Sequence, residues 1–327
     1  MQATNLIRTC SIWRALEAVG DTPTLLILEA NWLGVRRFDD FGRMTGLLKA
    51  LLSDRLKRLV GAGIFEKRAY SVSPPRFDYR LTPKGQALYP VAMMLLRWEL
   101  NWLSDPTKIG IEPTHKGCGH SFQPVPVCEH CRDEVRAFDV DWREGPGVGW
   151  MAPFYSRRRQ QRASAGGSTS LLELSAQLMG DRWASLIMRS IFTGIHRFDD
   201  IRRDTAIATN ILAERLAWLI GNDIIRQVQY AAGPERFEYR VTRKGVDYYP
   251  ALLALLQWGD TYYCSPEGPP VILIHKNCGH ELRTVIVCSE CRAPLRAPDV
   301  TVTVSGRPAQ APEAEAALET VPEADMV

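Results

Sequence analysis

The stretch SDRLKRLVGAGIFEKRAYSVSPPRFDYRLTPKG, from Ser53 to Gly85, decides the fold that we expect for this chain. Leucines recur at helical spacing at its start, and Gly63 provides a stop for that helix. Two segments rich in aromatic and β-branched residues follow, and SVSPPR divides them, which predicts a β-hairpin. Thr82 is placed to cap a further helix with Pro83 at its first position. The stretch therefore predicts the order helix, hairpin, helix.

Helical spacing also marks the residues on both sides of this stretch. CSIWRALEAVG and TPTLLILEANWLG, which lie before it, predict two helices, and RFDDFGRMT predicts a short third one. The helix that follows should bury one face, formed by Leu52, Leu56 and Leu59. From Pro83 onward, PKGQALYPVAMMLLRWELNWL predicts one long helix that is apolar on more than one side. We therefore expect this last helix to be buried against a large surface.

The whole pattern occurs twice in the sequence, and the second copy follows the first at a constant offset of 160 residues. AERLAWLIGNDI from Ala213 matches SDRLKRLVGAGI, ERFEYRVTRKG matches PRFDYRLTPKG, and RFDDIRRDT matches RFDDFGRMT. The register continues without an insertion or deletion, which is typical of a tandem duplication. Between the copies, GPGVGW and SRRRQQRASAGGSTS are rich in glycine and basic residues and predict a linker.

Length and composition limit the function classes. A chain of 327 residues is long enough for two domains, and its 46% hydrophobic and 24% charged residues are typical of soluble globular proteins. No apolar run is long enough to span a membrane, and the first residues do not resemble a signal peptide, so we expect a cytoplasmic location. No base, nucleophile pair or phosphate-binding glycine loop is found, so we assign no catalytic residue and do not expect an enzyme.

Basic residues gather in the first copy. Between Val35 and Gly85 there are twelve Lys/Arg against five Asp/Glu, whereas the matching stretch from Ile195 to Gly245 has nine against seven. A local basic surface suits a polyanionic partner, although a solvated charged face is the simpler alternative.

Helix, short helix, second helix and a two-stranded wing form the winged helix-turn-helix layout, in which the second helix enters the major groove of DNA. The groove is about 12 Å wide and admits one helix. On the second helix of the first copy, we expect Lys49, Ser53 and Lys57 to contact double-stranded DNA. Arg76 at the hairpin tip is expected to make a wing contact, and Arg68 is a weaker candidate.

The second copy has lost most of this charge. Thr209 and Ala217 replace the two lysines. We still expect Thr209, Asn210 and Arg236 to contact DNA: Asn210 is suited to reading adenine, and Arg236 keeps the wing position. The first copy should therefore supply more of the affinity. Arg55, by contrast, recurs as Arg215 between leucine positions, and we assign it to pairing within the protein.

Cysteine and histidine form two clusters at metal-ligand spacing. Six of the eight cysteines lie in HKGCGHSFQPVPVCEHCR and in its counterpart HKNCGHELRTVIVCSECR. An HxxC pair and a CxxC pair supply the four ligands that zinc prefers, so we predict two structural zinc ions per chain. Each ion is expected to lie within one copy, where the residues between the two pairs form a small hairpin. The first set is His115, Cys118, Cys128 and Cys131, and the second is His275, Cys278, Cys288 and Cys291. His120 and His280 are alternative ligands or neighbours of the site, and His130, which has no counterpart, is excluded.

The pattern as a whole resembles the HxlR-type winged helix-turn-helix transcriptional regulators. The resemblance rests on the RFDDF, SDRLKRLVGAGI and PPRFDYRLTPKG blocks, on LYPV with Trp98, and on their counterparts in the second copy, which include Trp258. It implies a family of homodimers with one motif per chain, so two copies in one chain suggest a covalent pseudo-dimer. It also implies an oxidant-sensing role for a cysteine at the position of Cys10, although a half-buried cysteine without a redox role is the simpler interpretation. The second copy carries Ser170 there, which rules out a disulfide between equivalent positions.

Together these patterns predict an α+β fold, mainly α, with two winged helix-turn-helix domains that are each followed by a zinc-ribbon-like segment. The expected parts are the first domain, its ribbon, a linker, the second domain, its ribbon and a disordered acidic tail, at residues 1–105, 106–140, 141–168, 169–264, 265–300 and 301–327. The expected function is a DNA-binding transcriptional regulator, a repressor that acts as a covalent pseudo-dimer of the two domains. A degenerate regulator that serves as a zinc-stabilised protein-interaction module is the alternative. An unknown small-molecule or redox effector and further dimerisation are left open, and no membrane partner is expected.

Overall fold

The computed structural model describes residues 6–73, 75–102, 110–152, 172–232 and 235–305. The helices and wing of the first copy are α1 (Ser11–Val19), α2 (Thr22–Trp32), α3 (Phe38–Thr45), α4 (Lys49–Gly61), β2 (Phe65–Val72), β3 (Pro75–Leu81), α5 (Pro83–Gln86) and α6 (Tyr89–Trp102). Those of the second are α7 (Glu173–Gly180), α8 (Arg182–Phe192), α9 (Phe198–Thr205), α10 (Thr209–Gly221), β8 (Ile225–Ala232), β9 (Glu235–Val241), α11 (Arg243–Asp247) and α12 (Tyr249–Tyr263). None of the helices in the described ranges has the length and apolar character needed to cross a membrane.

The predicted helix-turn-helix and wing are confirmed in both copies. The three leucines of α4 at positions 52, 56 and 59 are buried, and β2 pairs antiparallel with β3. The Thr82 side chain accepts a hydrogen bond from the backbone N–H of Gly85 at 3.2 Å, which caps α5 as the sequence predicts. Helices α3 and α4 are joined by Gly46, whose φ of +66° is a left-handed conformation that glycine adopts without strain.

The prediction of a single long helix after Pro83 is wrong. The structure divides it into α5 and α6, and divides the second copy in the same way into α11 and α12. Proline occupies position 90, and its counterpart at 250 lies at the start of α12. Because proline has no backbone N–H and clashes with the preceding turn, it is tolerated only in the first turn of a helix.

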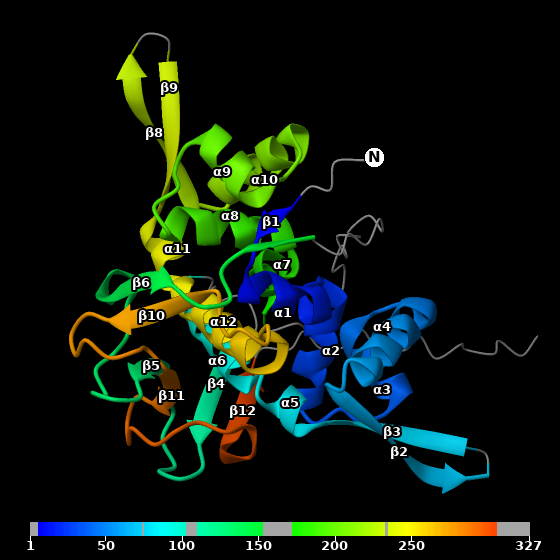
Figure 1. Cartoon of the computed structure of the whole chain (residues 1–327). Helices are drawn as coiled ribbons and strands as arrows, with labels where there is room; N and C mark the ends of the chain where they lie inside the picture. The colour runs from blue at the N-terminus through cyan, green and yellow to red at the C-terminus, as the bar shows by residue number, and fades with distance from the viewer. Residues whose placement is uncertain (1–5, 74, 103–109, 153–171, 233–234, 306–327) are drawn as a thin grey trace, which may run out of the picture.

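Helices α6 and α12 pack against each other at the centre of the molecule, and the two wings point away from it in different directions (Figure 1). The Trp98 indole N–H donates to the carbonyl of Lys244 at 2.9 Å, and the Trp258 indole N–H donates to the carbonyl of Lys84 at 3.0 Å. Both contacts join one copy to the other, and each is the counterpart of the other at the offset of 160. Such reciprocal contacts define an approximate two-fold axis. The expectation that the last helix of each copy is buried against a large surface is confirmed.

The strands outside the wings also join the two copies. Strand β4 (Gly110–His115) pairs with β12 (Val300–Ser305), β5 (Pro124–Cys128) with β11 (Thr284–Cys288), and β6 (Val140–Glu144) with β10 (Val271–His275). In the β5–β11 pair, Pro126 lies opposite Ile286, its own counterpart, so the approximate axis passes through this pair. The small hairpin expected inside each ribbon segment is therefore wrong, because its strands pair across copies.

Two of the expected domain limits also differ from the structure. Strand β6 and strand β7 (Trp150–Met151), which pairs with β1 (Ile7–Arg8), occupy the start of the segment expected to be a linker. Strand β12 extends to Ser305, into the segment expected to be a tail. The remaining parts of the linker and tail, 153–168 and 306–327, lie outside the described residues.

Candidate DNA interface and metal clusters

In the first copy, the outward face of α4 carries the residues predicted to contact DNA. Lys49, Ser53 and Lys57 are exposed, while the leucines on the opposite face anchor the helix in the core. Leu48, immediately before the helix, is 79% exposed and was not identified from the sequence. An exposed leucine at the start of this helix offers an apolar contact of the kind that recognises the methyl group of thymine.

The wing residues of the first copy differ in their charge environment. Arg76 is exposed on β3, opposite Ser71 of β2. Arg68 is exposed too, but its guanidinium pairs with Glu66 at 2.6 Å, so part of its charge is neutralised within the wing. The weaker DNA contact expected of Arg68 stays a prediction.

In the second copy, the corresponding face of α10 is exposed and carries no charge at the corresponding positions. Thr209, Asn210, Ala213 and Ala217 are all exposed, as is Arg236 on the wing. Two exposed arginines on α9, Arg202 and Arg203, were missed by the sequence analysis; each lies near an aspartate of the first turn of α9. The difference in charge between the two recognition helices α4 and α10 is therefore present in the folded protein.

Each recognition helix is held in place by a partly buried arginine. Arg55 of α4 pairs with Asp21 at 2.8 Å, and the Asp21 carboxylate also caps α2 by accepting from the N–H of Thr24. In the second copy, Arg215 pairs with Asp181, which caps α8. The role within the protein that we assigned to both arginines is confirmed.

The eight predicted metal ligands form two clusters, but each cluster takes half of its ligands from each copy. One cluster contains His115, Cys118, Cys288 and Cys291, and the other contains Cys128, Cys131, His275 and Cys278. The grouping by copy expected from the sequence is therefore wrong. The HxxC pair of one copy meets the CxxC pair of the other because β5 pairs with β11 at the approximate two-fold axis, and β4 pairs with β12 of the other copy.

The spacing of the ligand atoms suits a tetrahedral ion. Cys118 Sγ lies 3.5 Å from His115 Nδ1 and 4.0 Å from Cys288 Sγ, and Cys291 Sγ lies 3.2 Å from His115 Nδ1. In the other cluster, the corresponding distances run from 3.3 to 3.9 Å. Zinc with its usual bond lengths gives edges of about 3.5 Å between N and S and about 3.8 Å between two S atoms. Two Cys₃His clusters able to hold a metal are thus present.

Backbone hydrogen bonds turn the chain in the same way at both CxxC pairs. The N–H of Arg132 donates to the carbonyl of Cys128 at 2.9 Å, and Arg292 repeats this contact with Cys288 at 3.0 Å. A hydrogen bond from the backbone N–H of Ala293 lowers the pKa of the Cys291 thiol, whereas burial raises the pKa of the Cys288 thiol in the same cluster. The thiolate, which is the form that ligates a metal, is therefore favoured at Cys291 and disfavoured at Cys288.

The other histidines lie outside the clusters. His120 and His280 are exposed, and the His280 ring stacks on the His130 ring with centroids 3.4 Å apart. His280 Nδ1 lies 2.9 Å from the carbonyl oxygen of Cys278. His280 is thus a neighbour of its cluster, and the structure places no histidine besides 115 and 275 among the ligands within the described residues.

Cys10 lies at the start of α1 and is 5% exposed. It faces the buried guanidinium of Arg189 from the other copy. Its counterpart Ser170 lies outside the described residues. An oxidant-sensing role for Cys10 stays a prediction.

A family model described as HxlR-like helix-turn-helix matches the chain twice, at residues 18–107 and 178–267. The two matches contain both recognition helices and both wings. Together they cover more than half of the chain.

Several HTH-type transcriptional regulators are similar to one copy of the chain. One from Mycobacterium tuberculosis is 39% identical over 125 residues, which are 38% of this chain and 79% of that relative. One from Methanothermobacter thermautotrophicus is 34% identical over 98 residues, 30% of this chain and 75% of the relative. YodB of Bacillus subtilis is 30% identical over 96 residues, 29% of this chain and 85% of the relative.

Proposed function

The chain belongs to the HxlR-like helix-turn-helix family and is a DNA-binding transcriptional regulator, and from that premise we propose that it represses transcription as a pseudo-dimer within one chain. The observation that supports the pseudo-dimer best is the reciprocity of the contacts between copies, such as Trp98 with Lys244 and Trp258 with Lys84. A dimer with two-fold symmetry reads two half-sites in inverted orientation. One chain should therefore occupy one operator that is an imperfect inverted repeat.

The two half-sites should be bound unequally. Lys49 and Lys57 offer charge to DNA phosphates, whereas the equivalent residues of α10 are Thr209 and Ala217. Phosphate contacts supply most of the salt-dependent affinity, and base contacts supply sequence preference. We infer that the first copy anchors the chain and that the second reads its half-site mainly through Asn210 and the Arg236 wing.

Zinc is the metal that we propose for both Cys₃His clusters. Three thiolates and one imidazole nitrogen are a soft donor set that favours zinc over magnesium or calcium. Four protein ligands close the coordination, so the ions would be structural. Because each cluster has ligands from both copies, bound zinc would hold the copies together as well as stabilise the short strands around it.

The test is fluorescence anisotropy of the zinc-loaded protein on duplexes from upstream of its own gene, beside a scrambled duplex, across a salt series. Sequence-dependent binding of one chain per duplex supports the proposal. Weak binding that is equal on both duplexes and disappears as salt rises reflects phosphate attraction alone and contradicts it. In that case, the alternative of a protein-interaction module gains support.

A further inference from the structure

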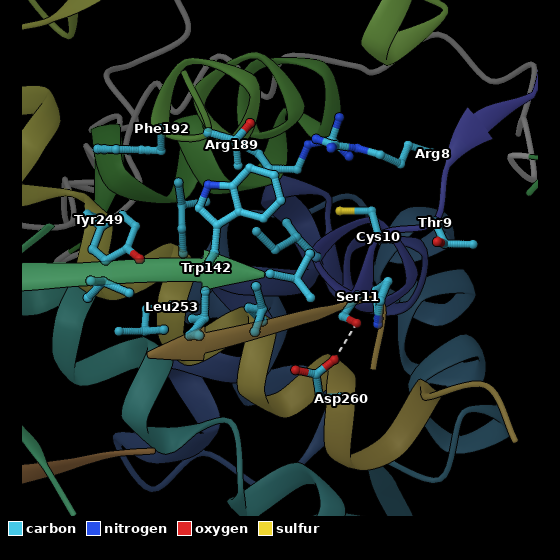
Figure 2. Close-up of a pocket in the computed structure, with 18 of the residues that line it drawn as sticks. Arg8, Thr9, Cys10, Ser11, Trp142, Arg189, Phe192, Tyr249, Leu253 and Asp260 are labelled. Atoms are coloured by element: carbon cyan, nitrogen blue, oxygen red, sulfur yellow. Dashed lines mark hydrogen bonds between the residues drawn. The ribbon is translucent and has the colours of Figure 1, made fainter. Parts of the chain in front are cut away.

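A cavity of about 90 Å³ lies where the beginning of the first copy meets α8 and α12 of the second (Figure 2). Its two ends differ in chemistry. Polar groups gather at one end, and apolar side chains line the other. The polar end includes Arg8, Cys10 and Arg189, and the apolar end includes Phe192, Tyr249 and Leu253. A pocket with one apolar end and a few convergent polar groups at an interface between domains is typical of a small-molecule site.

The polar end carries more positive than negative charge. Arg189 is 9% exposed and pairs with Asp204 of α9, and Arg8 pairs with the same carboxylate at 3.2 Å. Two guanidinium groups thus share one carboxylate, and Arg189 Nε has no hydrogen-bond partner among the described residues. A buried donor without a partner and a buried excess charge both cost free energy, which an anionic ligand would offset.

The remaining carboxylate at the cavity already has partners. Asp260 of α12 accepts a hydrogen bond from the Ser11 hydroxyl and is close to Arg14. Burial raises the pKa of Asp260 to about 6, and the Ser11 hydroxyl and the Arg14 charge oppose this shift. Asp260 therefore does not cancel the charge of Arg8 and Arg189.

Trp142 of β6 occupies the middle of the cavity. Figure 2 shows its indole between the polar and the apolar side chains, and the Arg8 guanidinium lies 6.0 Å from the centroid of its ring. The residue is 39% exposed, so the indole reaches solvent on one side. Arg8 is thus already in contact with an aromatic ring at this position, and a ligand carboxylate would replace that contact with an ion pair.

The equivalent elements of the other copy form a second cavity, which differs from the first at the position of Trp142. This second cavity, of about 400 Å³, has Val302 where the first has Trp142. Tyr89 and Met93 stand at the positions of Tyr249 and Leu253, and Glu29 stands at the position of Arg189. The bulkier indole thus stands in the smaller cavity, and a buried acid takes the place of a buried base.

We propose that the first cavity is an effector site for a small aromatic carboxylate. The carboxylate binds Arg189 and Arg8, and the aromatic ring lies against Phe192 and Leu253, where it displaces the Trp142 indole toward solvent. The Glu29 cavity has no guanidinium at the equivalent position and so lacks this partner for the carboxylate. Ligand binding in this cavity does not depend on the proposed function, whereas the effect of the ligand on DNA affinity rests on that function.

The cavity is connected to the DNA-binding unit of the second copy through Asp204. This aspartate lies on α9, the first helix of the helix-turn-helix, and Arg189 and the Ser190 hydroxyl of α8 both hold it. A ligand carboxylate competes with Asp204 for Arg189 and loosens the link between α8 and α9. Because a ligand shifts an equilibrium only through contacts that differ between states, this competition is the coupling step, and we expect the ligand to weaken DNA binding.

Isothermal titration calorimetry with benzoate, and with benzyl alcohol as its neutral counterpart, tests the site on the zinc-loaded full chain. Benzoate should bind at one site per chain, and at least tenfold more tightly than benzyl alcohol. Arg189→Met should weaken benzoate binding at least tenfold. Arg97→Met, which removes a partly buried arginine of α6 outside the cavity lining, should leave it unchanged. Trp142→Val should increase the affinity for the larger 1-naphthoate, and this gain of binding does not depend on whether the Arg189 variant folds.

Equal binding of benzoate and benzyl alcohol, or equal binding to wild type and Arg189→Met, would overturn the proposed carboxylate contact. Absence of binding to both wild type and Trp142→Val would overturn the site. Benzoate is then added to the protein–DNA complex in the anisotropy assay. A decrease in DNA affinity on adding benzoate that is retained in Arg97→Met and lost in Arg189→Met supports the effector role. Binding of benzoate without a change in DNA affinity overturns that role and leaves the site and the DNA-binding function intact.

Discussion

At the scale of single residues, charge on two equivalent helices separates the two copies. Lys49 and Lys57 project from α4, and their counterparts on α10 are uncharged. Replacing both lysines by glutamine should weaken operator binding and reduce the slope of log K against log salt by about two, because each phosphate contact contributes about 0.9. The measurement is anisotropy across a salt series.

Two controls separate this effect from a general loss of charge. Lys276→Gln removes a lysine of the ribbon segment that pairs with Asp141, and it should leave the slope unchanged. Replacing Thr209 and Ala217 by lysine should steepen the slope by a similar amount. A double glutamine variant with the wild-type slope would show that α4 does not contact the phosphates.

A second residue-scale prediction concerns Asp260, whose pKa is raised to about 6 by burial. In the unfolded chain an aspartate titrates near 3.9. Between pH 3.9 and about 6, Asp260 is protonated in the folded protein and ionised in the unfolded chain. The stability that this protonation contributes is therefore present at low pH and is lost as the pH rises through about 6. Relative to Asp260→Asn, the free energy of unfolding of wild type should fall by about 2 kcal/mol from pH 4.5 to 7.5.

Urea unfolding of both proteins at several pH values measures this difference, and metal release at low pH affects both alike. Asp141→Asn, at an exposed carboxylate of β6, is the matched control and should show no such trend. Parallel curves for wild type and Asp260→Asn would mean that Asp260 is hydrated in solution.

At the scale of elements, the sequence predicts what depends on local spacing. The leucine face of α4 and the Thr82 cap follow from residues a few positions apart, and both are confirmed. The break before α6 was missed, although Pro90 carried the signal. The partners of β5 were not predictable, because the duplication places an identical HxxC and CxxC pair in each copy. Ligand spacing is satisfied equally by pairing within a copy or across copies, and the grouping follows from contacts far apart in the sequence, such as the pairing of β5 with β11.

The crossed clusters give a prediction at this scale that separates the two groupings. Cys118→Ser with Cys291→Ser removes two ligands of one cluster, so the chain should keep one zinc. Cys118→Ser with Cys131→Ser damages both clusters, so the chain should keep none. Grouping within each copy predicts the reverse. The number of zinc ions per chain, measured by mass spectrometry of the metal in purified protein, distinguishes the two groupings. The wild-type protein, which should hold two ions, is the reference.

At the scale of the whole molecule, the copies are joined by more than the chain between them. Three strand pairs, two metal clusters and the α6–α12 contact all have one side in each copy. Elements that exchange partners in this way leave neither copy with a complete set of its own strands or ligands. The free energy that holds the halves together should therefore not depend on the covalent connection, which serves mainly to raise the effective concentration of one half near the other.

Residues 1–160 and 161–327, coexpressed as separate chains with a tag on only one, should therefore copurify in equal amounts and migrate as one particle of the full-length size. Binding of the inverted-repeat duplex should be retained, because both recognition helices keep their positions.

Cys118→Ser in the first half together with Cys278→Ser in the second removes one ligand from each cluster. This double variant should weaken the association of the halves by orders of magnitude, because metal binding supplies much of the folding free energy of short segments. Cys264→Ser, at a cysteine outside the clusters, is the control and should not change it. Halves that separate on a sizing column while both are folded and zinc-loaded would show that each copy completes its own strands and clusters, and the pseudo-dimer would then depend on the linker alone.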